Sequence, residues 1–255
     1  MNQRPGTARV VTWNIRGGVG LDGRFDLQRI IRVLKRHEPD IVALQEVDSR
    51  RGRAGGQHPF ALLREALGEH SVEAKSIIGT DGEYGQLLIS RWPLDNIHIH
   101  DISYPQCEPR RVIEAEVASP HGGFRMIATH LGLSFKERRG QARKLIEAAT
   151  RSPGLTVMAG DFNDWVWRGS VQNQIVKVLP ARTWQRTFPS FLPVIRLDRI
   201  YCRPYDALTR SWTDRTARIV SDHLPVFAEI QVGNHAAVIP ETDPGLDPGE
   251  AGRNP

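Results

Sequence analysis

Five short apolar runs in this chain each end in a polar side chain, and this repeated design limits what the chain can fold into. The runs are rich in β-branched residues and are typical of buried strands. The polar residues that end them are Asn14, Glu46, His130, Asp161 with Asn163, and Asp222 with His223. Each group alone is an ordinary cap or turn former. Taken together, they predict an oxygen-rich site formed by groups at the ends of several strands.

The last of these stretches, residues 219–226, places a carboxylate beside an imidazole. Ile219 and Val220 precede Asp222 and His223, and a second apolar run that alternates like a strand begins at Val226. Pro225 forbids a helix and favours an extended conformation for the residue before it. We therefore expect Asp222 and His223 on a short rigid turn at the mouth of a strand.

Hydrophobic periodicity predicts more strands than helices. The predicted strands lie at residues 8–14, 41–47, 71–78, 84–90, 97–102, 111–118, 123–129, 155–159, 197–202 and 226–232. The predicted helices lie after the cap Asp26 and at residues 59–67, 136–149 and 170–178. Hairpins mixed with helical crossovers favour an α/β (α+β) arrangement in layers over a purely parallel doubly wound sheet.

Composition favours one soluble domain over residues 8–232. We expect residues 1–7 to be a flexible N-terminus, and residues 233–255, which are rich in Pro, Gly and acids, to be a disordered tail. No apolar run approaches the roughly 20 residues that span a bilayer. The N-terminus lacks the apolar core of a signal peptide, which favours the cytoplasm. Cys107 and Cys202 fit two reduced thiols.

The chain is basic, with a net charge of +5 and a pI near 9.5. Such a charge favours polyanionic partners such as nucleic acid, phospholipid surfaces or phosphorylated small molecules, without choosing among them. Three basic stretches are candidates for contact with such a partner, at residues 50–53, 110–111 and 136–139. The alternative is that these side chains are simply solvated.

The polar strand ends supply the ligand types of a hard divalent cation. Glu46, Asn14 and Asp222 offer the oxygen donors that Mg²⁺ or Mn²⁺ prefers, and water and a substrate phosphate can complete an octahedron. The sequence contains no zinc-type Cys/His cluster and no P-loop. We therefore predict a site for Mg²⁺ (or Mn²⁺).

Six short motifs, in this order, resemble the successive signatures of the endonuclease/exonuclease/phosphatase superfamily, which includes deoxyribonuclease I. They are Thr12-Trp13-Asn14-Ile15, Leu44-Gln45-Glu46-Val47, Ala128-Thr129-His130-Leu131, Gly160-Asp161-Phe162-Asn163, Leu197-Asp198-Arg199-Ile200 and Ser221-Asp222-His223-Leu224-Pro225-Val226. Each motif is weak alone, but six in order are specific. The resemblance covers about residues 8–232 and implies a four-layer sandwich, in which two mixed β-sheets face each other with helices outside.

Hydrolysis of a phosphate ester gives each of these groups a predicted role. Asp161 and Asn163 would orient and deprotonate the attacking water, and His223 would stabilise the phosphate charge or share the role of base. Asp198 would fix the tautomer of His223. His130 is the candidate acid for the leaving group.

Arg110 stands in a Glu-Pro-Arg stretch that resembles one in the family, where the arginine faces the phosphate. We expect Arg110, Asn14 and Asn163 to bind the substrate phosphate. Arg16 stands where abasic-site endonucleases carry an acid, and those enzymes lack a histidine at the place of His130. The chain therefore resembles the deoxyribonuclease I, sphingomyelinase and phosphatase side of the superfamily more closely, and small bacterial members in particular.

The predicted function is a Mg²⁺- or Mn²⁺-dependent phosphodiesterase that acts as a monomer. Nucleic acid, DNA or RNA, is slightly favoured as substrate, because the basic stretches can follow a phosphate backbone. The rival substrates are a phospholipid or sphingomyelin head group and an inositol phosphate, with Trp165 and Trp167 as candidate contacts to a membrane interface. A hypothesis of another class is a non-catalytic scaffold that binds phosphate.

Overall fold

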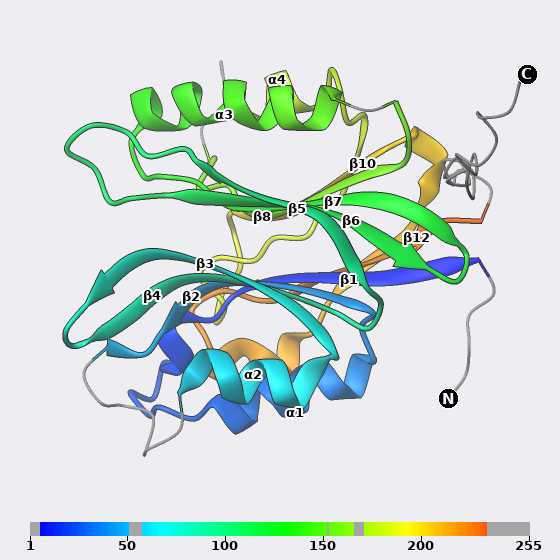
Figure 1. Ribbon diagram of the computed structural model, residues 1–255. Helices are drawn as coiled ribbons and strands as arrows, with labels where there is room; N and C mark the ends of the chain where they lie inside the picture. The colour runs from blue at the N-terminus through cyan, green and yellow to red at the C-terminus, as the bar shows by residue number, and fades with distance from the viewer. Residues whose placement is uncertain (1–5, 51–57, 152, 166–170, 234–255) are drawn as a thin grey trace, which may run out of the picture.

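The chain folds into two β-sheets stacked face to face with helices on both outer faces, as Figure 1 shows for the computed structural model. The structure describes residues 6–50, 58–151, 153–165 and 171–233. The four-layer sandwich expected from the sequence is therefore confirmed. The predicted flexible N-terminus and disordered tail fall almost wholly outside the described residues, as do Trp167 and most of the basic stretch at residues 50–53.

The first sheet has six strands in the order β11-β12-β1-β2-β4-β3. Its strands are β1 (Thr7–Asn14), β2 (Ile41–Asp48), β3 (His70–Gly79), β4 (Gly82–Ser90), β11 (Leu208–Thr213) and β12 (Val226–Gln231). The central neighbours β1 and β2 are parallel, and every other pair in this sheet is antiparallel. The carboxyl ends of β1 and β2 therefore lie at the same edge of the sheet.

The second sheet repeats this plan with the order β5-β6-β7-β8-β10-β9. Its strands are β5 (Leu94–Asp101), β6 (Arg111–Ser119), β7 (Gly122–His130), β8 (Thr156–Asp161), β9 (Ala181–Arg182) and β10 (Asp198–Arg203). Here β7 and β8 are the parallel pair, and the other pairs are antiparallel. Each sheet thus contributes one parallel pair whose carboxyl ends can carry functional groups.

Two of the α-helices, α1 and α3, begin at side-chain caps that the sequence supplies. The α-helices are α1 (Leu27–His37), α2 (Pro59–Leu67), α3 (Phe135–Thr150) and α4 (Val171–Ile175), and the short 3₁₀ turns are η1 (Arg16–Gly18), η3 (Tyr205–Ala207) and η4 (Arg215–Ile219). The Asp26 side chain accepts from the Arg29 N–H, as the sequence predicted. Ser134 and Glu137 form a reciprocal capping box at the start of α3.

Three hydrophobic clusters hold the four layers together. The central one lies between the sheets and contains residues of both inner faces, such as Val10 and Ala43 from the first sheet and Met126 and Val157 from the second. A second cluster joins α1 and α2 to the first sheet, and a third joins α3 and α4 to the second. Removal of this apolar surface from water is the main force that fixes the relative positions of the sheets.

The ten predicted strands are all present, with ends that differ by a few residues. The sequence did not predict β9 or β11, each of which forms one edge of its sheet. β9 has two residues, and the exposed positions of β11 interrupt the apolar pattern that marks a strand. None of the helices that the structure describes combines the length and apolar character needed to cross a membrane.

The two cysteines are predicted to react differently with a thiol reagent. Cys202 is fully buried in β10, and burial raises the pKa of its thiol to about 12, whereas Cys107 is partly exposed. Because the thiolate is the nucleophile, dithionitrobenzoate should modify one thiol in the native protein and two in guanidinium chloride. Peptide mapping should find Cys107 labelled, and rapid labelling of Cys202 in the native protein would contradict this packing.

Candidate active site

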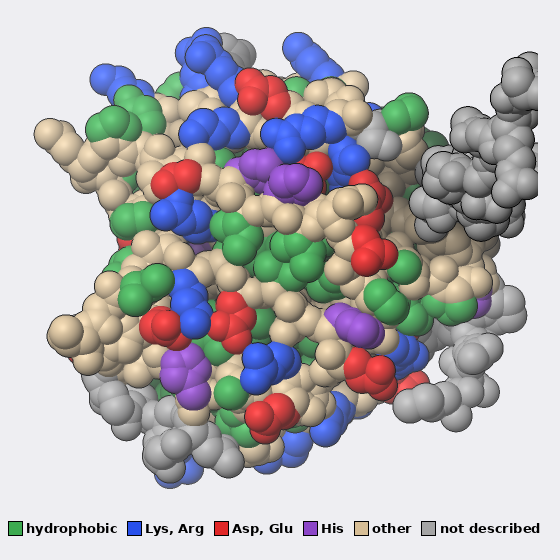
Figure 2. Space-filling model, viewed as in Figure 1, with side chains coloured by type: hydrophobic (Ala, Val, Ile, Leu, Met, Phe, Trp, Pro, Cys, Tyr) green, Lys and Arg blue, Asp and Glu red, His purple; other side chains and the backbone are tan. Residues whose placement is uncertain are grey.

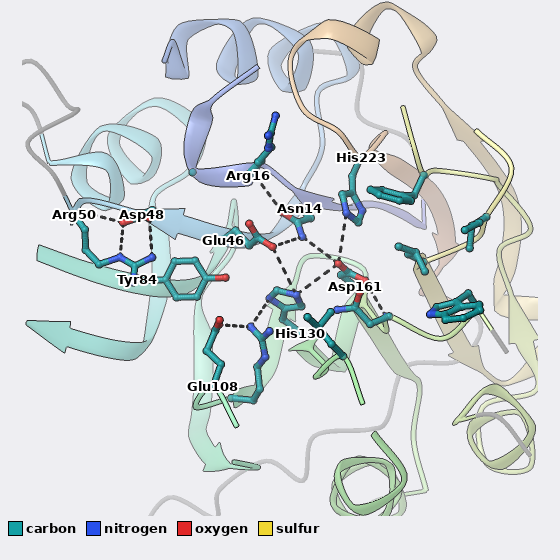
Figure 3. Close-up of a pocket in the computed structure, with 18 residues that line it drawn as sticks. Asn14, Arg16, Glu46, Asp48, Arg50, Tyr84, Glu108, His130, Asp161 and His223 are labelled. Atoms are coloured by element: carbon teal, nitrogen blue, oxygen red, sulfur yellow. Dashed lines mark hydrogen bonds and ion pairs between the residues drawn. The ribbon is translucent and has the colours of Figure 1, made fainter. Parts of the chain in front are cut away.

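The ends of the two parallel strand pairs meet between the sheets, and one amide group connects them. Asn14, the last residue of β1, donates from Nδ2 to Oε1 of Glu46 at 2.8 Å and to Oδ2 of Asp161 at 3.1 Å. Glu46 belongs to the first sheet and Asp161 to the second. A single side chain thus ties the carboxylates of the two sheets together, as Figure 3 shows.

A glycine permits the close pairing of the strands that carry His130 and Asp161. These two residues are register partners on the parallel strands β7 and β8, one step beyond the pair Thr129 and Gly160. A Cβ atom at Gly160 would stand 2.0 Å from the Thr129 carbonyl oxygen. Because real Cβ atoms do not approach an oxygen so closely, the strand pairing beside the site requires glycine at this position.

A β-bulge presents Glu46 to the site. The register between β2 and β4 shifts between Leu44 and Val47, and the Glu46 backbone has a φ of +57°. A left-handed backbone is unfavourable for a glutamate, and such strain is tolerated where the surrounding structure holds it. Bulges of this kind redirect a side chain out of its regular alternation. Burial, aided by the nearby Asp161 carboxylate, raises the pKa of Glu46 despite its bond from Asn14.

His223 is held as an imidazolium by two buried carboxylates. Its Nδ1 lies 2.8 Å from Oδ2 of Asp198, and its Nε2 lies 3.9 Å from Oδ2 of Asp161. Burial opposes the charge on the ring, but Asp198 and Asp161 outweigh it and raise the pKa of His223 to about 10. The ring therefore carries a proton at neutral pH, with its Nε2 turned toward Asp161.

His130 has the opposite protonation state. The Arg110 guanidinium donates from an Nη atom to Nδ1 of His130 at 3.1 Å, so that His130 carries its hydrogen on Nε2. Burial and the positive charges of Arg110 and His223 lower the pKa of His130 well below its usual value. A neutral imidazole donates a hydrogen bond but does not serve as a strong acid. The surroundings of His130 in this structure favour its neutral form, and its role as leaving-group acid stays a prediction.

Asp161 and Asn163 occupy one tight turn after β8. The Asn163 N–H donates to Oδ1 of Asp161 at 2.9 Å, and the Asn163 side-chain amide donates to the Leu131 carbonyl at 2.9 Å. Burial is the main cause that raises the pKa of Asp161, and the nearby Asp198 adds to it while His223 opposes it. Oδ2 of Asp161 is the oxygen on which Asn14, His130 and His223 converge.

Asp222 and Arg16 form an ion pair beside the site. The Arg16 Nε lies 3.5 Å from Oδ2 of Asp222, and the Arg16 backbone N–H donates to Oδ1 of Asn14 at 3.1 Å. Arg16 thus engages the oxygens of two of the three metal ligands that the sequence predicted. Asp222 does not line the cavity that contains the other predicted residues, and its role as a ligand stays a prediction.

A cavity of about 700 Å³ lies over these groups. Seven of the predicted site residues line it, together with residues that were not predicted to belong to the site. The predicted residues in its lining are Asn14, Glu46, Arg110, His130, Asp161, Asn163 and His223. Asp198 is fully buried behind His223. The additional lining residues include Asp48, Arg50, Tyr84, Glu108, Leu133, Trp165, Phe188, Ile195 and Leu197.

Tyr84 is the functional candidate that the sequence reasoning left out. Its hydroxyl points into the cavity (Figure 3) and lies beside Arg110. Burial, together with Glu46 and Glu108, raises the pKa of Tyr84, so the hydroxyl stays neutral and can donate a hydrogen bond. A Tyr-Gly-Gln stretch resembling a family strand was the available signal, but the sequence alone gave no direction for the side chain.

The donor set of the cavity fits a metal ion. Glu46 and Asp161 are two carboxylates in one cavity whose burial raises their pKa, and a cation would compensate both. Ligand atoms of Asp161, Asp198 and His223 also lie within 4.8 Å of one another, but a protonated His223 offers no lone pair to an ion. Oxygen donors of this kind suit a hard divalent cation.

The layered sandwich and the cavity at the ends of two parallel strand pairs define a protein of the deoxyribonuclease I-like class. The chain belongs to the endonuclease/exonuclease/phosphatase family, whose sequence profile matches residues 11–223. The resemblance noted from the sequence motifs is therefore confirmed.

Known proteins share both the sequence and the fold. The uncharacterized protein YbhP of Escherichia coli strain K12 is 29% identical over 247 residues, which span 88% of this chain and 96% of YbhP. An endonuclease/exonuclease/phosphatase from Beutenbergia cavernae has a TM-score of 0.71 at 21% identity, covering 89% of this chain and 72% of its own. Truncated TDP2 of Caenorhabditis elegans has a TM-score of 0.61 at 21% identity, covering 88% and 97%. The structural similarities establish the fold.

The charge of His223 is predicted to depend on Asp198. In Asp198→Asn the largest cause that raises the pKa is gone while burial remains, so the pKa of His223 should fall from about 10. Histidine ring signals in a ¹⁵N-edited NMR titration between pH 5 and 11 report this change. In the wild type His223 should remain protonated at pH 8 while His130 stays neutral, and equal titration of the two rings would refute the assignment.

Proposed function

We propose that this protein is a divalent-metal-dependent phosphodiesterase. The observation that supports this proposal is the convergence of the buried carboxylate of Asp161, the half-buried carboxylate of Glu46, one imidazolium and one guanidinium on a single cavity. Cleavage of a phosphate ester needs an oriented nucleophile, neutralisation of the phosphoryl charge and stabilisation of the leaving oxygen. The residues of the cavity are of the types that perform these tasks.

Glu46 is the residue we assign to metal binding, because it lines the cavity and has a carboxylate that no arginine pairs with in the described part of the chain. Asn14 and Asp222 would complete the protein ligands, either directly or through water. Polarisation of a phosphoryl oxygen by a Lewis acid is the chemistry that Mg²⁺ or Mn²⁺ supplies in such a site. The family in general is hydrolytic and uses divalent metals, in agreement with this assignment.

Asp161 is the proposed general base. Its raised pKa brings the carboxylate closer to neutral pH, where a base is most effective. Asn14 and the Asn163 N–H hold the carboxylate in place. In this proposal Oδ2 takes a proton from the attacking water, and the side-chain oxygen of Asn163 helps to orient that water.

His223 and Arg110 are the proposed cationic groups for the phosphate. His223 carries its charge into the cavity through Nε2, and Asp198 keeps the ring protonated and fixed. Arg110 is almost fully buried, and its contacts to Glu108 at 2.8 Å and to His130 hold the guanidinium at the cavity wall. Neutral His130 and Tyr84 would add hydrogen-bond donors for the phosphoryl or leaving-group oxygens.

Nucleic acid remains the favoured substrate class, although the basic stretches that first suggested it are largely engaged elsewhere. Arg50 pairs with Asp48, and Arg111 pairs with Asp101. Arg138 is buried and donates to the carbonyls of Gly132 and Leu133. In Figure 2 basic side chains gather over α3, while acidic and basic side chains are interspersed over the rest of that face. The expected tracking surface is therefore only partly available.

A phosphodiester of a lipid head group is the second candidate substrate. Exposed apolar side chains stand near the cavity, where Leu133 and Trp165 line its wall and Phe191 and Leu192 lie on the loop after the lining residue Phe188. Such side chains can enter the interface of a bilayer. The same cavity would then act on a phosphate held at a membrane surface.

Chelation of the metal is predicted to abolish turnover. Bis-p-nitrophenyl phosphate should be hydrolysed with Mn²⁺ or Mg²⁺, should not be hydrolysed in excess EDTA, and should be hydrolysed again when Mn²⁺ is restored. Glu46→Gln should weaken Mn²⁺ binding in isothermal titration calorimetry, because it replaces the charged ligand by a neutral one. Turnover that persists in EDTA would contradict the metal requirement. The absence of turnover with any phosphodiester or monoester would favour the non-catalytic scaffold.

Asp161→Asn is predicted to lower kcat on the same small diester by about 10²- to 10⁴-fold, the usual contribution of a general base. Far-UV circular dichroism should show an intact fold, because asparagine keeps the shape of the side chain. Asp95→Asn is a matched control on the exposed edge strand β5 and should behave as the wild type. Wild-type turnover by Asp161→Asn would remove the proposed role of Asp161.

A further inference from the structure

Four arginines gather on the flank of the sandwich where β9 and β11, one edge strand from each sheet, come together. Arg182 ends β9, Arg186 and Arg196 lie on the segment that leads from β9 to β10, and Arg199 is the second residue of β10. Burial and the positive charges of Arg186, Arg199 and Arg182 lower the pKa of Arg196. The guanidinium groups of Arg182 and Arg196 both lie over the ring of Trp184, and Arg199 donates to the Arg196 carbonyl, so these three arginines lie side by side.

These charges are not neutralised by any carboxylate in the part of the chain that the structure describes. Within the described ranges of the chain, no Asp or Glu oxygen lies within 4.0 Å of a nitrogen of Arg182, Arg186, Arg196 or Arg199. Arg196 and Arg199 instead donate to backbone carbonyls, of Trp184 and of Asp164 and Arg196 respectively. By contrast, the arginines of the stretches at 50, 110 and 111 each face a carboxylate. The cluster is therefore a concentrated positive charge on a protein whose other arginines are mostly paired.

An exposed tryptophan lies within this cluster. Trp184 is 58% exposed, with the guanidinium carbon of Arg182 4.1 Å from its ring centroid and that of Arg196 at 5.9 Å. Trp184 and Arg182 line a groove of about 390 Å³ together with Tyr205, which is 71% exposed, and Leu208. Exposed aromatic side chains that line one groove together offer apolar surface to a partner.

A short ladder of backbone hydrogen bonds lies between the groove and the proposed catalytic cavity. Trp184 stands four residues before Phe188, and Arg196 directly follows Ile195, while Phe188 and Ile195 both line the cavity. Phe188 and Ile195 exchange backbone hydrogen bonds at 3.1 and 2.9 Å. Four extended residues span at most about 14 Å. A chain molecule that leaves the cavity along this ladder reaches Trp184 within a few repeating units.

We propose that this groove binds the unpaired bases and backbone phosphates of a single-stranded nucleic acid whose scissile phosphate lies in the catalytic cavity. Aromatic side chains that stack on bases, set among cations that bind phosphates, form the usual surface for single strands, and stacking requires that the bases be unpaired. Trp184 is the stacking platform, and Arg182 and Arg186 bind phosphates. The inference deepens the proposed function and rests on it for the cleavage step alone.

Binding of a fluorescein-labelled 20-residue oligothymidylate in EDTA, followed by fluorescence anisotropy, tests the groove without turnover. Trp184→Ala should weaken binding by roughly 5- to 100-fold, the usual effect of losing one stacked base, and Trp184→Phe should restore most of it. Arg182→Ala/Arg186→Ala should lower the slope of log K against log salt by about 1.4, since each phosphate contact on a single strand contributes about 0.7. Arg32→Ala, an exposed arginine on α1, is the matched control and should match the wild type.

Three results would overturn the proposal: wild-type affinity in Trp184→Ala, no rescue in Trp184→Phe, or an unchanged salt slope in the double arginine variant. Binding of the protein to anionic lipid vesicles but not to the oligonucleotide would also overturn it, in favour of a lipid surface. Hydrolysis of bis-p-nitrophenyl phosphate, measured in parallel, separates the two proposals. Turnover of the small diester without oligonucleotide binding would support the phosphodiesterase and refute the groove. Oligonucleotide binding without turnover would support the groove and refute the phosphodiesterase.

Discussion

Burial of the two inner sheet faces against each other is the constraint on which the candidate site depends. The site is not contained in either half of the molecule, because Glu46 comes from the first sheet and Asp161 from the second. Only the packed interior between the sheets sets their separation, and the Asn14 amide then spans it. An interior packed at nearly crystalline density tolerates little displacement. The sandwich therefore holds the reacting groups at fixed distances.

Two histidines in one cavity acquire opposite charges from their neighbours alone. His223 faces Asp198 and Asp161 and keeps its proton, whereas His130 faces Arg110 and loses it. Identical side chains are thereby assigned different tasks, one as a cation and the other as a neutral hydrogen-bond donor. The sequence motifs do not show that a carboxylate lies beside one histidine ring and a guanidinium beside the other.

The sequence predicted the layers, the ten longer strands and the side chains at the strand ends, because those features follow from hydrophobic alternation and from motifs in order. It could not predict β9 or β11, whose pairing depends on neighbours distant in the chain. The left-handed backbone of Glu46 arises from a bulge in the register with β4, which no local pattern marks. The pairing of Arg16 with Asp222 and the inward direction of Tyr84 likewise emerge only when distant segments meet.

Because a single amide spans the two sheets, the rate of the proposed reaction should respond to changes in how the interior is packed. A relative slip of the sheets by about 1 Å would stretch the 3.1 Å contact between Asn14 and Asp161 beyond hydrogen-bonding distance, and misplacement on that scale can slow an enzyme by about two powers of ten. Truncation of the Met126 or Val157 side chain in the central cluster, outside the cavity, would then impair the proposed catalysis at temperatures where the protein is still folded. Inactivation would precede melting.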